Sequence, residues 1–159
     1  MAQEKITFEQ FVETVEPAQK AFVEEFHAYL LERGCKVAFQ EKKSGFLASY
    51  KYGKPPRALL NFLFRKQGML VRIYGENIAA YPDLLGALPP EMVEAIAQSG
   101  DCGRLVKNTC SPKCIGYDFM VGGAHFQKCR YNCFEFLVCE AHNGYIRAFA
   151  ERELDARQG

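Results

Sequence analysis

The chain has 159 residues, of which 48% are hydrophobic and 25% are charged, and its formal net charge is +1. This is the size and composition of one globular domain with its own core, which excludes a disordered chain, and no apolar run reaches the roughly 18 residues that a membrane span needs. The near-neutral charge gives no general reason to expect nucleic acid or a membrane surface as a partner.

Two helices are predicted before the first strand. Thr7 and Gln10 form a capping-box pattern that opens a short helix ending at Val15. A second helix begins at Pro17 and ends at Gly34, and its aromatic side chains follow helical spacing as a packing stripe.

From Lys36 onward the hydrophobic pattern has a period of two, which is typical of strands. Gly and Pro at 53–56 and the pair Gln67-Gly68 predict turns. The expected strands are Lys36–Glu41, Gly45–Tyr52, Arg57–Lys66 and Met69–Tyr74. Because each follows the previous one after a short turn, we expect an antiparallel meander.

The last hairpin of this meander also has a predicted register. A two-residue turn at 67–68 gives these pairs: Phe64 with Val71, Phe62 with Ile73, Arg65 with Leu70, Leu63 with Arg72, and Asn61 with Tyr74. One face of the hairpin is then wholly apolar and the other is mixed. This pattern is typical of a sheet that helices cover on one side.

The mixed face gathers Lys51, Arg65 and Arg72. Arginine offers a planar fork of donors that suits a carboxylate or phosphate, so a small anionic ligand is one interpretation of this face. The other interpretation is an ordinary solvated sheet face, because antiparallel sheets often leave one face in water.

The second half of the chain begins with helical segments. Residues 76–88 are expected to be helical in pieces around Pro82, and the next helix begins at Pro89-Pro90 and ends at Gly100. Further along, residues 134–139 resemble a strand, and Asn143 is expected to cap a final helix.

These elements predict an α+β fold in a single domain, residues 1–159. We expect an antiparallel β meander packed against N- and C-terminal helices. A cysteine-bearing β-hairpin, within residues 102–139, completes the domain.

The cysteines carry the most distinctive motif in the chain. Two pairs, each with three intervening residues, are Cys110 with Cys114 and Cys129 with Cys133. Gly122-Gly123 lies between the pairs and predicts a two-residue hairpin turn with Val121 opposite Ala124. Period-two alternation then places all four thiols at one end and on one face of the hairpin, which indicates a zinc site because paired ligands in such sites are about two to four residues apart.

Other roles for the cysteines stay open. Free cysteines are often inert buried residues, and a thiol pair can also do redox chemistry. Cys102 could replace one of the four ligands, whereas Cys35 and Cys139 lie in apolar runs and are expected to be core. Seven cysteines without a secretory pattern at the N-terminus favour a reducing cytoplasm over a disulfide framework.

The sequence does not identify an enzyme and favours a non-catalytic role. It contains no glycine-rich phosphate loop, nucleophile elbow or His-Glu-x-x-His motif. Of its histidines, His125 is expected near the hairpin turn and away from the thiols, and His27 and His142 have no neighbours that suggest a charge relay.

Three segments carry a resemblance to other proteins: residues 64–74, 110–119 and 128–136. Over these segments the chain resembles a group of small bacterial proteins with paired C-x3-C motifs and no assigned activity, and the similarity extends from about Cys35 onward. The resemblance implies a self-contained cytoplasmic bacterial domain and supplies no catalytic residues.

Together these patterns predict a small cytoplasmic binding or regulatory module with a structural zinc site at its cysteines. The alternatives are a thiol-redox protein or sensor, and a binder of small anions on the cationic sheet face. The expected partner is a small anionic ligand or another protein. Basic and aromatic residues at 128–131 are a weaker indication of nucleic acid, which the near-neutral charge disfavours.

Overall fold

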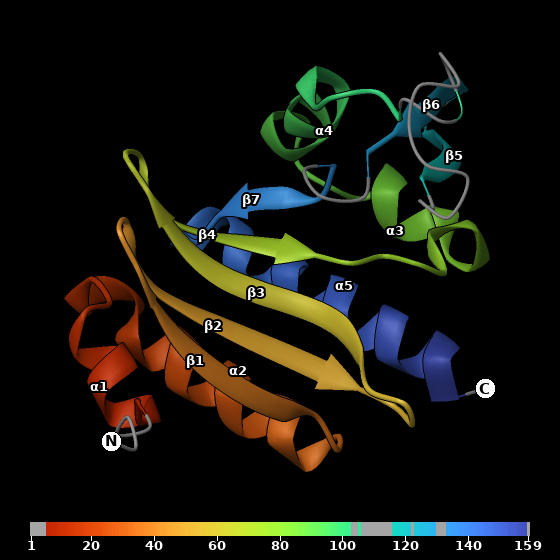
Figure 1. Ribbon diagram of the computed structural model, residues 1–159. Coiled ribbons are helices and arrows are strands. Elements are labelled where there is room, and N and C mark those ends of the chain that lie inside the picture. Colours follow the sequence, from red (N-terminus) through yellow and green to blue (C-terminus); the bar gives the residue numbers. More distant parts are fainter. Residues whose placement is uncertain (1–5, 103–104, 106–115, 122, 130–132, 159) are drawn as a thin grey trace.

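Figure 1 shows the fold as a computed structural model, which describes residues 6–102, 105, 116–121, 123–129 and 133–158. The helices are α1 (Phe8–Glu13), α2 (Lys20–Glu32), α3 (Pro82–Gly86), α4 (Pro90–Gln98) and α5 (Glu140–Gln158), with 3₁₀ turns η1 (Pro17–Gln19) and η2 (Ile78–Ala80). The strands are β1 (Lys36–Lys42), β2 (Gly45–Tyr52), β3 (Arg57–Arg65), β4 (Gly68–Ile73), β5 (Tyr117–Val121), β6 (Ala124–Lys128) and β7 (Glu135–Leu137). No helix among the described residues is long and apolar enough to cross a membrane.

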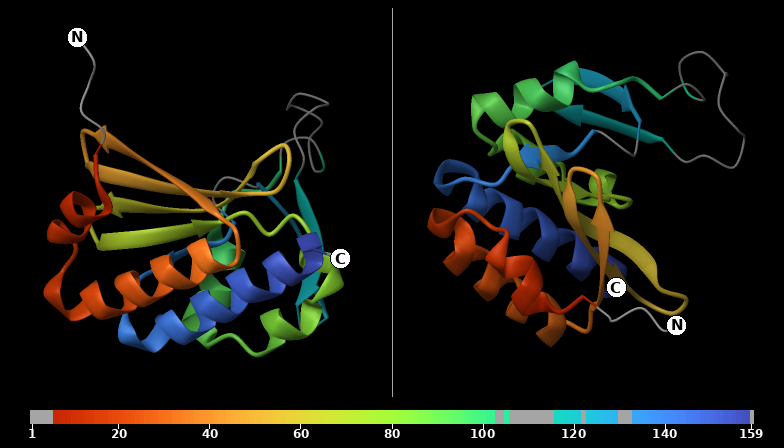
Figure 2. Two further views of the ribbon diagram at one scale, coloured as in Figure 1. Left: turned by 90° about the horizontal axis from the view of Figure 1, so that it is seen from below. Right: turned by 60° about the vertical axis from the view of Figure 1, so that its left-hand side comes forward.

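The predicted α+β fold is confirmed. The main sheet has five antiparallel strands in the order β1-β2-β3-β4-β7, and β5 and β6 form a separate two-stranded sheet. The meander β1 to β4 is therefore present, and β7 joins its edge from much later in the chain. Helices from both ends of the chain, α1, α2 and α5, lie on one face of the main sheet (Figures 1 and 2).

Aromatic side chains form the contact between these helices and the sheet. Phe62 in the middle of β3 is fully buried, and its ring centroid lies 6.1 Å from that of Phe11 in α1 and 6.0 Å from that of Phe26 in α2. Phe149 of α5 packs against Phe134 at 4.9 Å, next to β7. Large rings at helical spacing on one side and strand spacing on the other explain why these helices cover this face.

The capping box at the start of α1 is also confirmed. Thr7 Oγ1 accepts a hydrogen bond from the Gln10 backbone N at 3.2 Å, and Gln10 Oε1 accepts one from the Thr7 backbone N at 2.8 Å. Two amide groups without partners inside the helix are thereby satisfied.

The predicted register of the β3–β4 hairpin is wrong by two residues. Phe64 pairs with Met69 and Phe62 pairs with Val71, because the two-residue turn lies at Lys66-Gln67. Gly68, which has a φ of +123°, becomes the first paired residue of β4. A shift of two preserves the alternation of side chains, so the predicted division into an apolar and a mixed face holds.

The final helix begins earlier than predicted. The backbone N atoms of His142 and Asn143 both donate to the Cys139 carbonyl at 2.9 Å, so α5 starts at Glu140. Asn143 is therefore not the cap but lies inside the first turns, where its Nδ2 donates to Gln19 Oε1 at 2.7 Å. This contact ties α5 to the connection between α1 and α2.

A buried carboxylate holds the other half of α5 in place. Glu153 is fully buried and accepts hydrogen bonds from the Tyr81 hydroxyl at 2.5 Å, Asn77 Nδ2 at 2.8 Å and Arg157 Nε at 2.8 Å. Arg157 also donates to the Tyr74 carbonyl at 2.9 Å. Because each oxygen of the carboxylate has donors, its burial is compensated, and α5 is fixed against the segment that follows β4.

Candidate functional site

The cysteine segment is built around the β5–β6 hairpin, whose register agrees with the prediction. Val121 pairs with Ala124, and Gly123 in the turn has a φ of +87°, a conformation that favours glycine. Tyr117 and Phe119 are buried on one face, with ring centroids 5.2 Å and 5.4 Å from that of Phe134. The hairpin therefore packs onto the domain by its predicted apolar face.

Three of the cysteines lie at the open end of this hairpin. The Cys102 backbone N donates to the Gln127 carbonyl, and the Cys129 backbone N donates to the Gly100 carbonyl, both at 2.9 Å. The Cys133 backbone N in turn donates to the Cys129 carbonyl at 3.1 Å. Backbone bonds thus hold residues 100–102 beside the end of β6 and keep Cys129 and Cys133 close.

The packing around Cys102 brings the start of β5 to the same place. Gly116 lies so close to the Cys102 side chain that a Cβ at position 116 would collide with its sulfur. Residue 116 is two residues after Cys114 in the chain. Gly116, directly before β5, and Cys129, directly after β6, therefore both lie next to the segment that contains Cys102.

Lys128 anchors this end of the hairpin to α4. The residue is only 6% exposed, and Nζ donates to the carbonyl oxygens of Ala97 and Ser99, both at 3.0 Å, and to Asp101 Oδ1 at 2.9 Å. A cation is favourable at the C-terminal end of a helix, where carbonyl groups lack partners. Lys128 therefore fixes the position from which Cys129 follows.

The described thiols differ in environment. Cys133 is buried, and burial raises the pKa of its thiol far above the usual value, although the nearby Lys128 ammonium acts in the opposite direction. Cys129 is half-buried. Cys35 is buried in the main core, where burial raises the pKa of its thiol to about 11. A raised pKa keeps a thiol protonated and unreactive, as expected for core cysteines.

The predicted zinc ligands are only partly within the described residues. Cys129 and Cys133 are described, whereas Cys110 and Cys114 are not, so the convergence of the four thiols stays a prediction. Within the part of the chain that the structure describes, no group of three or more His, Cys, Asp or Glu side chains could hold a metal. Cys102, Cys129 and Cys133 alone are therefore not a metal centre.

His125 lies away from the thiols. It pairs with Met120 across the hairpin near the turn, and its Nε2 lies 2.5 Å from Asp118 Oδ1 on the exposed face. This hydrogen bond lowers the pKa of the Asp118 carboxyl. Both side chains of the pair are solvent-exposed, so the pair contributes little to stability.

The mixed face of the main sheet contains the predicted arginines. Arg65 and Arg72 lie on one face, and both contact Glu135 of β7: Arg72 Nε is 3.1 Å from Oε2, and the Arg65 guanidinium is 3.4 Å from Oε1. The prediction that the two arginines share the face opposite Phe62 is confirmed by the register. The Glu135 carboxylate thus forms ion pairs with two guanidinium groups.

A hollow opens on this face at the end formed by the β1–β2 and β3–β4 turns. Its cationic lining residues are Lys42, Lys43, Arg65, Lys66 and Arg72, and its apolar ones are Leu47, Leu63 and Phe64. No carboxylate is among the described residues that line it. Lys51, the third predicted cation, lines a different hollow with Lys36 and Lys54, at the other end of β1 and β2.

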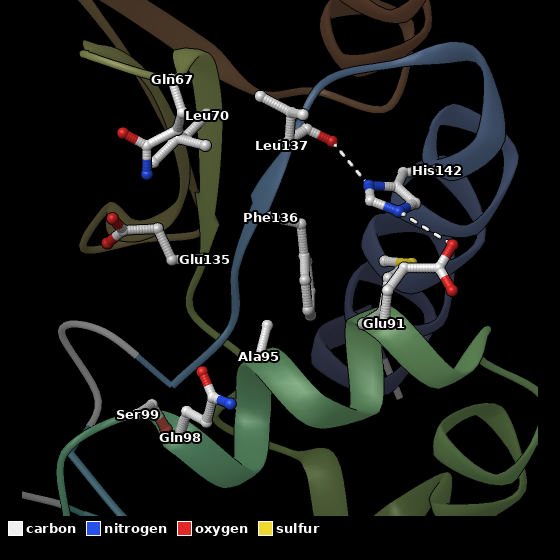
Figure 3. Close-up of a pocket in the computed structure, with 11 residues that line it drawn as sticks. Gln67, Leu70, Glu91, Ala95, Gln98, Ser99, Glu135, Phe136, Leu137 and His142 are labelled. Atoms are coloured by element: carbon white, nitrogen blue, oxygen red, sulfur yellow. Dashed lines mark hydrogen bonds and ion pairs between the residues drawn. The ribbon is translucent and has the colours of Figure 1, made fainter.

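A second hollow lies between α4 and the edge strand β7 (Figure 3). His142 of α5 bridges its wall, because its Nδ1 is 3.0 Å from the Leu137 carbonyl and its Nε2 is 3.4 Å from Glu91 Oε1. A carbonyl can only accept, so Nδ1 carries the proton. His142 thus connects α5, β7 and α4, and nothing next to it in Figure 3 is placed as a nucleophile.

The sequence interpretation did not include the three lysines of the hairpin tips, Lys42, Lys43 and Lys66. The signal was available, since each lies next to a predicted turn and alternate turns of a meander lie at the same end of the sheet. No family model matches the chain, and no curated protein or solved structure matches it significantly. Function is therefore inferred from the side chains described above.

Proposed function

We propose that the chain is a small cytoplasmic binding or regulatory module whose cysteine hairpin is held together by a structural zinc ion. The proposed ligands are Cys110, Cys114, Cys129 and Cys133. The observation that supports this most is the placement of Cys129, bonded through its backbone to Cys133 and to Gly100 at the end where both strands of the hairpin open.

The register of the hairpin supports the remaining two ligands. Pairs along β5 and β6 have residue numbers that sum to 245, as in Tyr117 with Lys128. The ladder ends at this pair, and the bond from the Cys133 backbone N to the Cys129 carbonyl closes a turn directly after it. Cys114 precedes Gly116 by two residues, so the first pair of thiols is expected at the end of the hairpin where this turn lies. Four thiolates form a closed tetrahedral shell that pins a loop and leaves no open position for catalysis.

Zinc binding would change the protonation of the buried Cys133 thiol. Zinc binds the thiolate, so the proton must leave, and binding becomes stronger as the pH rises. Burial raises the pKa of this thiol; the ammonium of Lys128 acts in the opposite direction and would partly compensate the negative charge of a four-thiolate site.

A redox role for the same cysteines has less support. A reactive thiol needs a lowered pKa and access to solvent, whereas Cys133 is buried and has a raised pKa. A disulfide between Cys129 and Cys133 is an alternative outcome of the test below.

The test combines elemental analysis with a count of free thiols on the purified protein. We expect one equivalent of zinc per chain, released with loss of thermal stability when a chelator is added. Cys114→Ser should lose the metal and lower the melting temperature, because binding energy at a structural site is folding energy. Cys139→Ser is the matched control, since Cys139 lies outside the hairpin and is half-buried, and it should keep the metal.

The contrary outcomes are distinct. A protein without metal, whose melting does not respond to a chelator, would leave these cysteines as buried thiols. With denaturant and chelator present, so that buried and metal-bound thiols are exposed, fewer free thiols than cysteines under non-reducing conditions would indicate a disulfide and support the redox alternative.

A further inference from the structure

The tips of two hairpins meet at one end of the main sheet. The β1–β2 turn follows Lys42 and the β3–β4 turn follows Arg65, and both turns point to the same end of the sheet in Figure 1. This corner, defined by Lys42, Lys43, Arg65 and Lys66 with Leu47 and Leu63 beside them, is called the tip corner below. Leu47 is next to the buried Ala48, and Leu63 is next to the buried Phe62, so alternation places the tip corner on the sheet face opposite the helices. Figure 2 shows α1, α2 and α5 together on the other face.

The tip corner concentrates positive charge. Its hollow is lined by five cationic side chains, Arg72 included, whereas the whole chain has a net charge of only +1. Among the residues that the structure describes, Glu135 is the one carboxylate that forms ion pairs with them, through Arg65 and Arg72. Among the described residues, no carboxylate forms an ion pair with Lys42, Lys43 or Lys66. Like charges held together repel one another, and a bound anion would relieve this repulsion.

The floor of the hollow is apolar. Leu63 pairs with Leu70 across β3 and β4, and Leu70 pairs with Leu137 across β4 and β7. Leu47 of β2 lines the same hollow as Leu63 and continues this row of leucines. An aliphatic or aromatic group on Leu47 and Leu63 would be removed from water while an attached anionic group reached the cations.

A second lysine hollow on the same sheet provides a contrast. Lys36 and Lys51 are paired across β1 and β2 and line it with Lys54. This hollow also contains three ammonium groups, but its lining has neither an arginine nor a leucine. Positive charge is therefore common to both hollows. The tip corner differs because it combines an arginine guanidinium with apolar leucine side chains.

We propose that the tip corner binds a free amphiphilic organic anion, a carboxylate or phosphate attached to a short aliphatic or aromatic body. The anionic group lies between the Arg65 guanidinium and the ammonium groups of Lys42 and Lys66, and the body lies on Leu47 and Leu63. This inference rests on the proposed role as a binding module and not on the zinc ion.

The test uses hexyl phosphate as the probe and follows backbone amide shifts by NMR. We expect saturable shifts at residues 42–47 and 63–68, and binding at least about tenfold tighter than that of inorganic phosphate, because several methylene groups leave water. Hexyltrimethylammonium, which has the same body and the opposite charge, should cause no saturable shift. An absence of saturable shifts with hexyl phosphate would overturn the proposal.

Two double variants separate the tip corner from general attraction of anions. Arg65→Gln with Lys66→Gln should weaken binding of hexyl phosphate by about tenfold or more, whereas Lys36→Gln with Lys51→Gln should change it by less than about twofold. All four positions are solvent-exposed, so melting temperatures should stay close to wild type. Equal losses in both variants would show diffuse electrostatic attraction and overturn the proposal.

The apolar floor and the source of the anion are tested separately. Leu47→Asn should reduce the preference for hexyl phosphate over inorganic phosphate while leaving the binding of inorganic phosphate unchanged.

Vesicles of phosphatidylglycerol should not sediment the protein more than vesicles of phosphatidylcholine. Sedimentation by phosphatidylglycerol without binding of hexyl phosphate would indicate a membrane surface and contradict a free ligand. The Gln variants should also keep any bound zinc, so that a failure here is distinguishable from a failure of the metal site.

Discussion

The two hairpins β3–β4 and β5–β6 are both closed by two-residue turns, yet only one has the register that its sequence predicts. Gly122-Gly123 leaves one position for the turn between the apolar runs on either side. The segment around Gln67-Gly68 allows two positions for the turn, and the chain turns one residue earlier than predicted, at Lys66-Gln67. Moving a two-residue turn by one residue changes every partner by two, so the faces survive while the pairs do not.

The hairpins also differ in what holds them. The β3 strand lies in the centre of the five-stranded sheet, with a neighbour on each side and helices over one face. Within the described part of the chain, the strands of the β5–β6 hairpin pair with each other and with Asp101. The hairpin is attached to the domain through the rings of Tyr117 and Phe119 and through Lys128. We expect packing to dominate the stability of the first hairpin and a few anchoring contacts to dominate that of the second.

The largest difference should come from truncating one ring in each hairpin. Phe62→Ala should lower the free energy of unfolding by about 3–5 kcal/mol, because a fully buried ring leaves a cavity among Phe11, Phe26 and Tyr50. Phe126→Ala, at a half-buried position in β6, should cost less than half as much. Denaturant unfolding followed by circular dichroism measures both. Similar losses would mean that the second hairpin is as central to the fold as the first.

A smaller effect should follow from removing the anchor of the second hairpin. Lys128→Met keeps the length of the side chain but removes the donor to the Ala97 and Ser99 carbonyls, so about 1–3 kcal/mol should be lost. Lys66→Met, at an exposed turn, is the control and should change stability by less than about 0.5 kcal/mol. In the Lys128 variant, hydrogen exchange should rise first in β5 and β6. Uniform exchange across the chain would contradict a local anchor.

The contrast between the hairpins also shows what could be predicted from the sequence. Period-two alternation and the capping box identified the strands, the helix face of the sheet and the common face of Arg65 and Arg72, because these follow from local backbone geometry. The pairing of β7 with β4 and the contact of both arginines with Glu135 depend on chain segments 63 residues or more apart, for which the local pattern has no signal.

The candidate site was predicted less completely for a related reason. The hairpin register that supports Cys129 and Cys133 followed from its turn. The corner formed by Lys42, Lys43 and Lys66 needed the tips of two separate hairpins to be placed side by side. The buried Glu153 was not foreseen, because a helical glutamate is usually exposed and its partner Tyr81 is 72 residues away in the chain.

Glycine substitutions test the turn of the second hairpin at a scale of about 1 kcal/mol. Gly123→Ala should destabilise the protein, because its φ of +87° is unfavourable for alanine although nothing lies within 4 Å of the new methyl group. Gly144→Ala should stabilise it by a similar amount, because this position lies inside α5 and is equally open. Thermal melts of both variants suffice. A stable Gly123→Ala protein would mean that the turn does not depend on the left-handed conformation.

The smallest effect concerns pH and the contact between α2 and the main sheet. His27 of α2 stacks on Phe8 at 3.7 Å and its Nδ1 lies 2.8 Å from the buried Tyr50 hydroxyl of β2. Burial lowers the pKa of His27, with Glu9 acting in the opposite direction. The unfolded chain therefore binds a proton more readily than the folded one. The free energy of unfolding should be highest above the ordinary histidine pKa of about 6.5 and should fall as the pH drops through that value toward the lowered pKa.

His27→Gln removes this titration while keeping a polar group near Tyr50. The difference in unfolding free energy between wild type and His27→Gln should therefore shrink between about pH 7.5 and pH 5, in favour of the variant. The β5–β6 hairpin should be insensitive to this change, because the described ring contacts of His27 are with Phe8 of α1 and Tyr50 of β2. Amide exchange measured at both pH values would show whether protection in β5 and β6 stays unchanged. A difference in unfolding free energy that stays constant with pH would mean that His27 titrates alike in the folded and unfolded chain. A loss of amide protection at low pH that is confined to α1, α2 and β2 would show that the main sheet and the cysteine hairpin respond separately to acid.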